Sequence, residues 1–316
     1  MDGVLKATWS TPPPLNPTYY VYVPDYNMGS LSAGTHTLKV VTDSSNVIAE
    51  SNEGDNQYTK TIVVGPNRTD FNSDGKSDYL LLDAAGNTKV SYLNGATLLS
   101  TVNGPTIATG WQLASVNDFD GDGKPDWILF NPTTLQTGIQ YLNNTAALGT
   151  AYGPTLPAGW VLRATADFNK DGKPDYLIFN PSTFETRVYY LNGTVLSSTI
   201  DGPPLTAGWT LVSANDFNGD GIPDYLLVDT AGNTKIWTIT AFNGASSTYT
   251  SAAGPVIPSG WQLLSALGDY NSDKKRDWVL FNSSTLQTQI WYMNGVTKIG
   301  SANGPTLPAG FSVFGR

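Results

Sequence analysis

Apolar residues along this chain come in short runs separated by turn residues, and no long stretch shows apolar residues at helical spacing. One unit reads DFDGDGKPDWILF at residues 118–130, an acidic, glycine-containing loop followed by an apolar run of strand length. Near copies of this unit begin at residues 70, 167, 216 and 269. Such runs between turn residues predict β-strands, and their repetition predicts a repeat architecture.

Each repeat contains four strand-like segments. In the second unit these are WQLASVNDF before the loop, DWILFN after it, TGIQYLN, and a last segment that leads to YGPTLPAGW. Turns of the same kind recur as NGPTIATGW, DGPPLTAGW, AGPVIPSGW and NGPTLPAGF. The period is about 50 residues, which fits one four-stranded β-propeller blade.

The two ends of the array differ from its middle. The first loop follows GPNRTDF and lacks the GWxL strand that precedes the other four, whereas the chain ends in GFSVFGR, which has GWxL spacing and no loop after it. We therefore predict that residues 310–316 supply the missing strand and remove the exposed sheet edges. The predicted fold class is all-β: a five-bladed β-propeller over residues 66–316, closed by a C-terminal strand. An open solenoid is the alternative.

The acidic loops share the pattern D-x-[DN]-x-D-G-x-x-D. Oxygen ligands at positions 1, 3, 5 and 9 suit a hard cation such as Ca²⁺, and glycine at position 6 permits the positive φ that turns the chain. An aspartate-rich turn that caps backbone amides is the alternative, but it does not explain why carboxylates that repel one another converge. The predicted metal ligands are Asp70, Asn72, Asp74, Asp78, Asp118, Asp120, Asp122, Asp126, Asp167, Asn169, Asp171, Asp175, Asp216, Asn218, Asp220, Asp224, Asp269, Asn271, Asp273 and Asp277.

The fifth loop departs from the pattern. Lys274 replaces the glycine, and Lys275 and Arg276 add positive charge. We predict four strong calcium sites and a weaker fifth. Position 12, where an EF-hand has glutamate, is leucine or isoleucine in every copy, so the loops are expected between strands and not between helices.

The loops and the blade period resemble the FG-GAP/VCBS repeat family, over residues 70–316. The resemblance implies calcium-bearing blades like those of integrin-type heads, fungal lectins and bacterial surface proteins, and hence a secreted or surface-displayed protein. It does not imply a particular ligand.

Residues 1–65 resemble the second half of the bacterial cell-adhesion-related Ig-like domain, CARDB, at GTHTLKVV (34–41) and AESNEGDN (49–56). An Ig-like sandwich needs about 100 residues. We therefore predict a partial Ig-like β segment whose open edge packs on the propeller, pairs with another chain or stays poorly ordered. Glu50, Glu53 and Asp55 fit either an ion site or, more simply, a solvated turn.

Composition changes the picture in three ways. The net charge of -9 comes from acidic residues concentrated in the loops, so five divalent cations would bring the protein close to neutrality. No basic cluster with interleaved aromatics supports nucleic-acid binding, and no apolar run is long enough for membrane insertion. The chain contains no cysteine and starts at MDGVLKATW without signal-peptide features, so we expect a removed targeting segment or a longer parent chain.

Recurrent aromatics bear on binding. Trp111, Trp160, Trp209, Trp261 and Phe311 share one position, which favours packing between blades over sugar binding. The less regular Tyr189, Trp237 and Trp291 are better candidates for exposure.

The functional prediction is a non-enzymatic, calcium-binding propeller that acts in adhesion or glycan binding, with a glycan or cell-surface protein as partner. The single histidine, His36, falls in a predicted strand, and no GxSxG, HExxH or cysteine nucleophile is present. One alternative is a structural module of a surface fibre or adhesin that self-associates through the N-terminal segment. A calcium-assisted polysaccharide-active enzyme is the second alternative.

Overall fold

The computed structural model describes residues 2–10, 34–45, 52, 54, 56–64, 68–243 and 247–315. The chain divides into two compact units, Met1–Gly65 and Pro66–Arg316. Within the described ranges there is no helix long and apolar enough to cross a membrane.

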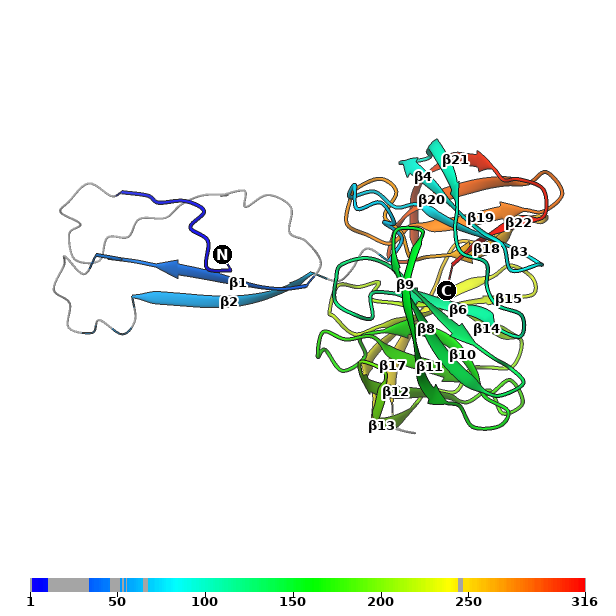
Figure 1. The fold of residues 1–316 in the computed structure, drawn as a ribbon, viewed down its shortest axis with the longest axis horizontal. Coiled ribbons are helices and arrows are strands. Elements are labelled where there is room, and N and C mark those ends of the chain that lie inside the picture. Colours follow the sequence, from blue (N-terminus) through cyan, green and yellow to red (C-terminus); the bar gives the residue numbers. More distant parts are fainter. Residues whose placement is uncertain are drawn as a thin grey trace. The chain divides into compact units, whose positions relative to one another are not determined.

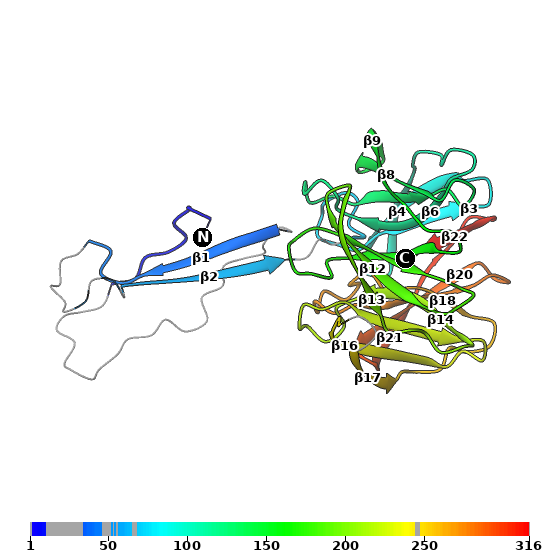
Figure 2. The same cartoon turned by 90° about the horizontal axis from the view of Figure 1, so that it is seen from below.

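The second unit consists of five four-stranded antiparallel sheets, the blades of a propeller (Figures 1 and 2). Blades 2 to 5 are each built from consecutive strands. Their strands are β6 (Gln112–Asn117), β7 (Asp126–Phe130), β8 (Gln136–Asn143) and β9 (Ala146–Thr155); β10 (Val161–Ala166), β11 (Asp175–Phe179), β12 (Thr186–Asn192) and β13 (Val195–Gly202); β14 (Trp209–Asn215), β15 (Asp224–Asp229), β16 (Thr234–Ala241) and β17 (Thr248–Ala253); and β18 (Gln262–Ser265), β19 (Trp278–Asn282), β20 (Gln287–Asn294) and β21 (Thr297–Thr306).

The first blade confirms the predicted C-terminal closure. Its strands are β22 (Phe311–Phe314), β3 (Tyr79–Asp83), β4 (Thr88–Asn94) and β5 (Thr97–Asn103), in that order. Strand β22, red in Figure 1, lies beside the cyan β3 and pairs Val313 with Leu81. The all-β, five-bladed prediction is therefore confirmed, and the open solenoid is excluded.

Packing between blades rests on one aromatic residue at the start of each second strand. These residues are fully buried, and each approaches a glycine in the preceding blade, where a Cβ would come within 3.3 Å or less of the ring or its hydroxyl. The pairs are Gly104 with Trp127, Gly153 with Tyr176, Gly202 with Tyr225, Gly254 with Trp278 and Gly304 with Tyr79. A side chain at any of these five positions would overlap with the aromatic residue, which explains why each of the five blades has glycine before the proline of this turn.

The prediction that Tyr189, Trp237 and Trp291 are exposed was wrong. Their exposed fractions are 6%, 2% and 3%. Side chains of a third strand alternate between the two neighbouring blades: in β12, Tyr189 packs with residues of blade 2 and Val188 with residues of blade 4. Both faces of this strand are therefore covered.

The central channel contains a residue that the sequence analysis did not single out. The Arg68 guanidinium is buried and donates to Thr165 O at 2.5 Å and to Asn215 Oδ1. Burial lowers the pKa of Arg68 to about 9. The segment that leads into the first blade is thereby tied to the inner strands of blades 3 and 4.

The first unit contains one described antiparallel pair, β1 (Gly34–Val41) and β2 (Gln57–Val64). His36 lies in β1, as expected, and its Nδ1 is 2.8 Å from Asp2 Oδ2. Val40, Val41 and Tyr58 are exposed. Glu50, Glu53 and Asp55 lie outside the described residues.

Candidate metal centre

The five acidic loops occupy equivalent places in the five blades. In blades 2 to 5 each loop joins the end of the inner strand to the start of the second strand, and in blade 1 it precedes β3 directly. Since the blades form a closed ring, the loops gather on one face of the propeller. All twenty predicted ligands thus lie in five local groups of four and not in one central cluster.

The first aspartate of each loop holds the turn in shape. In the second loop Asp118 Oδ1 accepts from Gly121 N at 2.7 Å, and its Oδ2 accepts from Gly123 N at 2.9 Å. Gly123 has φ of +85°, a conformation that a side chain disfavours. Gly75, Gly172 and Gly221 repeat both the conformation and the bond to the first aspartate.

The ninth-position aspartate is buried and joins the loop to the third strand. Asp126 Oδ2 accepts from Phe119 N and its Oδ1 accepts from Leu142 N, both at 2.9 Å. Burial raises the pKa of Asp126 to about 7. The same two bonds recur in the other loops, and burial raises the pKa of the equivalent residues to about 7 at Asp78, Asp175 and Asp224 and to about 6 at Asp277.

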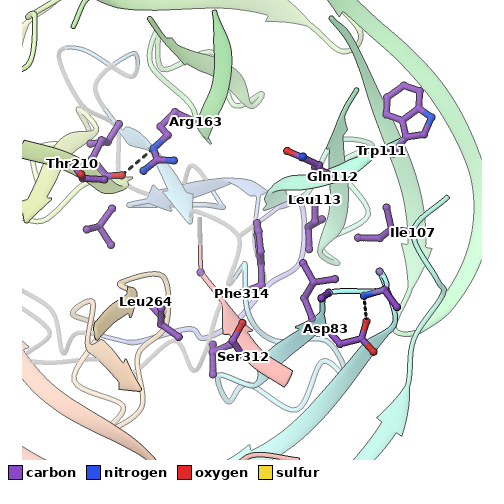
Figure 3. Close-up of a pocket in the computed structure, with 18 of the residues that line it drawn as sticks. Asp83, Ile107, Trp111, Gln112, Leu113, Arg163, Thr210, Leu264, Ser312 and Phe314 are labelled. Carbon is purple, nitrogen blue, oxygen red and sulfur yellow. Dashed lines mark hydrogen bonds between the residues drawn. The ribbon is translucent and has the colours of Figure 1, made fainter. Parts of the chain in front are cut away.

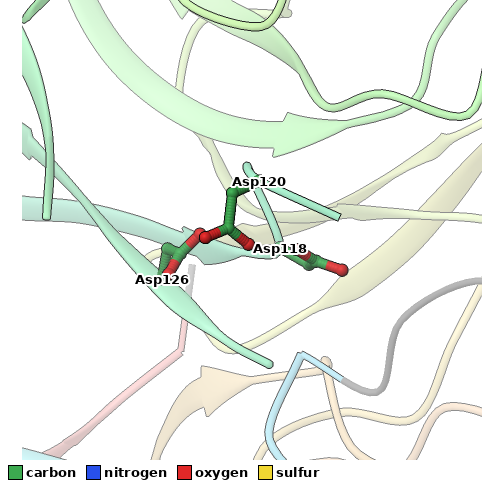
Figure 4. A group of neighbouring side chains, drawn as sticks. All are labelled: Asp118, Asp120 and Asp126. Carbon is green, nitrogen blue, oxygen red and sulfur yellow. The ribbon is translucent and has the colours of Figure 1, made fainter. Parts of the chain in front are cut away.

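The second loop brings three carboxylates together (Figure 4). Ligand oxygens of Asp118, Asp120 and Asp126 all lie within 4.8 Å of one another. Asp122 is not in this group; its Oδ1 accepts from Lys124 N at 2.8 Å, and its Oδ2 lies 3.7 Å from Lys124 Nζ. In this geometry the predicted ligands at positions 1, 3 and 9 converge, and the one at position 5 points to the next residues of the loop.

The remaining four loops carry asparagine at position 3. Each asparagine Nδ2 donates to the aspartate at position 5, so its amide plane is fixed by its own loop. Ca²⁺ binds oxygen atoms of carboxylates and side-chain amides such as these, and water and backbone carbonyls complete its coordination shell. The donor set therefore fits a hard divalent cation, and fits it best at Asp118, Asp120 and Asp126.

The fifth loop keeps the backbone of the others despite its lysine. Lys274 has φ of +67°, and its N donates to Asp269 Oδ2 at 2.7 Å, as the glycine amides do elsewhere. Arg276 is turned inward: it is half-buried, and its Nη1 donates to Leu267 O at 2.9 Å. Only Lys274 and Lys275 of the three basic residues are therefore placed on the exposed part of the loop.

Comparisons with known proteins agree with this arrangement. A model of the FG-GAP-like repeat matches residues 70–129 and 167–227, which contain the first four loops and not the fifth. The CARDB model matches residues 2–60. No curated protein matches the sequence.

Solved structures with a detectable likeness share little sequence with the chain. They include a protein of unknown function from Bacteroides caccae, with 8% identity over 72% of this chain and 73% of that one and a TM-score of 0.39. The Tc holotoxin pore of Photorhabdus luminescens has 15% identity over 82% of this chain and 14% of its own, with a TM-score of 0.39. The V. cholerae biofilm matrix protein Bap1 has 16% identity over 87% and 40%, with a TM-score of 0.26.

Proposed function

We propose that this chain, which matches the FG-GAP-like repeat model over residues 70–129 and 167–227 and the CARDB model over residues 2–60, is a calcium-stabilised, non-enzymatic binding module acting in adhesion outside the cell. Both families are typical of extracellular or surface proteins. Its partner in this proposal is a glycan or a protein of a cell surface.

The observation that carries the proposal is the recurrence of a buried aspartate beside further acidic side chains. Without a cation, burial disfavours the ionised form of Asp126, and Asp118 and Asp120 disfavour it further through like charge. A bound cation would replace this repulsion by shared coordination. In the second blade, a filled loop would then hold the end of the inner strand close to the third strand, through the hydrogen bond that Leu142 N donates to Asp126.

A calcium titration tests the metal. We expect the melting temperature to rise with Ca²⁺, to fall in chelator and to recover when Ca²⁺ is added back, because a ligand that binds only the folded state stabilises it. Asp120→Ala should lower the melting temperature in Ca²⁺ but not in chelator, where it removes a like charge beside Asp126.

Asp120→Asn is the matched control, because asparagine stands at this position in the other four loops. It should retain most of the calcium response. If Asp120→Ala lowers the melting temperature equally in Ca²⁺ and in chelator, the second loop does not bind the metal. If the melting temperature of the wild-type protein does not respond to Ca²⁺, the proposal of a calcium-stabilised module is wrong.

A second candidate is an assembly module that pairs through the first unit. The exposed Val40, Val41 and Tyr58 on β1 and β2 favour it, because apolar residues on a narrow sheet are commonly covered by a partner. Light scattering over a range of concentrations tests it. A monomer at every concentration would count against assembly and leave the adhesive role in place.

A further inference from the structure

A pocket of about 640 Å³ opens on the face of the propeller opposite the acidic loops, where the inner strands begin. Figure 3 shows that its walls come from all of the blades, with Phe314 in the middle of the view. Phe314 and Leu113 provide apolar surface there. The polar residues of the lining include Asp83, Gln112, Arg163 and Thr210.

The charged groups of the pocket lie on different sides of it and have opposite signs (Figure 3). Arg163 Nε donates to Leu211 O at 3.1 Å, which fixes the guanidinium at the wall. Asp83 accepts from the backbone of Ala85 and from both nitrogens of Asn87, and the Asn87 side chain holds the pKa of Asp83 below its ordinary value. One fixed donor and one fixed acceptor around an apolar surface are the features of a small-molecule site.

Blade 2 departs from a pattern that blades 1, 3 and 4 follow on this same face, whereas blade 5 has the uncharged Gln289 at the equivalent position. A basic side chain of the third strand lies over the aromatic residue that begins the inner strand: Lys89 over Phe311 at 5.4 Å, Arg187 over Trp160 at 5.0 Å, and Lys235 over Trp209 at 3.8 Å. The equivalent position of blade 2 is Gly138, opposite Leu129 in the ladder. No side chain therefore lies between Trp111 and the sheet.

Trp111 rests directly on Gly138, because a Cβ at that glycine would be 3.2 Å from the indole ring. Tyr152, the ladder partner of Gly138, lies nearly parallel to Trp111, with ring centroids 6.2 Å apart and planes 24° apart. Tyr152 is 70% exposed. The two rings form an open aromatic platform, and Trp111 also lines the pocket, so the two surfaces are continuous.

We propose that this pocket and the Trp111–Tyr152 platform form one binding surface for a neutral oligosaccharide. A sugar ring presents a flat face of C–H groups that stacks on aromatic rings, and its hydroxyls both donate and accept. Hydroxyls of the adjoining sugar are thus suited to Asp83 as acceptor and Arg163 as donor. A purely cationic ligand would be repelled by Arg163, and a purely anionic ligand would be repelled by Asp83. The inference rests on the proposed binding function and assigns it a surface and a ligand class.

The test is binding of the full chain, at fixed Ca²⁺, to an array of neutral oligosaccharides of glucose, galactose, mannose and N-acetylglucosamine, followed by titration calorimetry on the best ligand. We expect Tyr152→Ala to weaken binding about tenfold, which corresponds to the loss of about 1.4 kcal/mol of aromatic stacking. Gly138→Lys should place a cation at the platform, as in blade 4, and reduce binding at least as much.

Tyr249→Ala is the matched control, because Tyr249 is an exposed outer-strand tyrosine stacked on a tryptophan of blade 4, away from this surface. It should bind as the wild type does, and the two tyrosine variants should keep the wild-type melting temperature. Unchanged affinity in both Tyr152→Ala and Gly138→Lys would overturn the inference, as would a wild type that binds no member of the array. If that wild type still gains stability from Ca²⁺, the proposed calcium module stands without the sugar site.

Discussion

Gly304 of the last blade lies against Tyr79 of the first, where a Cβ on the glycine would come within 2.9 Å of the tyrosine hydroxyl oxygen. The same relationship joins every pair of neighbouring blades. The seam at which the ring closes is therefore packed like the four seams between consecutive blades.

Gly304→Ala should lower the free energy of unfolding by about 1–3 kcal/mol, because the added methyl group overlaps with Tyr79 and Thr288. The measurement is urea unfolding followed by tryptophan fluorescence. Gly149→Ala, in an outer strand with nothing near its Cβ position, is the control and should change stability by less than about 0.5 kcal/mol. Equal effects would show that the seam is not tightly packed.

The closing strand can be tested through Val313, which is 5% exposed in β22. Val313→Asp should cost about 3–5 kcal/mol, because it buries an unpaired charge where the first and last blades meet. Ile299→Asp, at a position 55% exposed in β21, makes the same chemical change on the surface and should be nearly neutral. Thermal unfolding of the two variants compares them, and similar melting temperatures would contradict the role given to β22.

Lys274 offers a stabilising change. Because its φ is +67°, replacement by glycine relieves left-handed strain of about 1–2 kcal/mol. Glycine also gives the unfolded chain more conformational entropy, which opposes folding by about 0.5–1 kcal/mol. Lys274→Gly should therefore stabilise the metal-free protein by about 0.5–1 kcal/mol. Lys275→Gly removes the same charge without relieving strain and should destabilise it. Chemical denaturation in chelator measures both, and a loss of stability in Lys274→Gly would be the contrary result.

The buried aspartates predict an unusual pH dependence. In chelator, Asp126 keeps its proton to about pH 7 in the folded state, whereas the unfolded chain releases it near the ordinary value of 3.8. The folded state thus binds more protons in this range, and the free energy of unfolding should fall as the pH rises from about 5 to 7. Bound Ca²⁺ should reverse the trend, since protons then compete with the ion. Denaturation at several pH values, with and without Ca²⁺, measures this, and a chelated protein that gains stability toward pH 7 would refute it.

The repeat made most of the fold predictable. The spacing of the acidic loops gave the number of blades, and the orphan GFSVFGR segment gave the closing strand, because each signal was readable without knowing any distant contact. Exposure within a blade was not readable in this way. Tyr189, Trp237 and Trp291 look irregular in sequence, but third strands are covered on both faces by neighbouring blades.

The candidate metal loops were predictable as sequence patterns, whereas the direction of each side chain was not. Nothing in the spacing distinguishes Asp122, which turns toward Lys124, from Asp120, which faces Asp118 and Asp126. The aromatic platform was missed because the feature that reveals it is a missing side chain at Gly138. Aligning the five repeats at Lys89, Gly138, Arg187, Lys235 and Gln289 would have shown one glycine among long side chains.

The strand β22 also determines the order in which the propeller can be assembled. Blades 2 to 5 are made of consecutive strands, so each can pair as soon as its own residues have been synthesised, but β3 has to wait for Phe311–Phe314. Until then the inner edge of β3 presents unpaired amide and carbonyl groups, which readily pair with another chain. The nascent protein is therefore most vulnerable at its first blade, and exchange of β22 between two chains is the misassembly that this architecture favours.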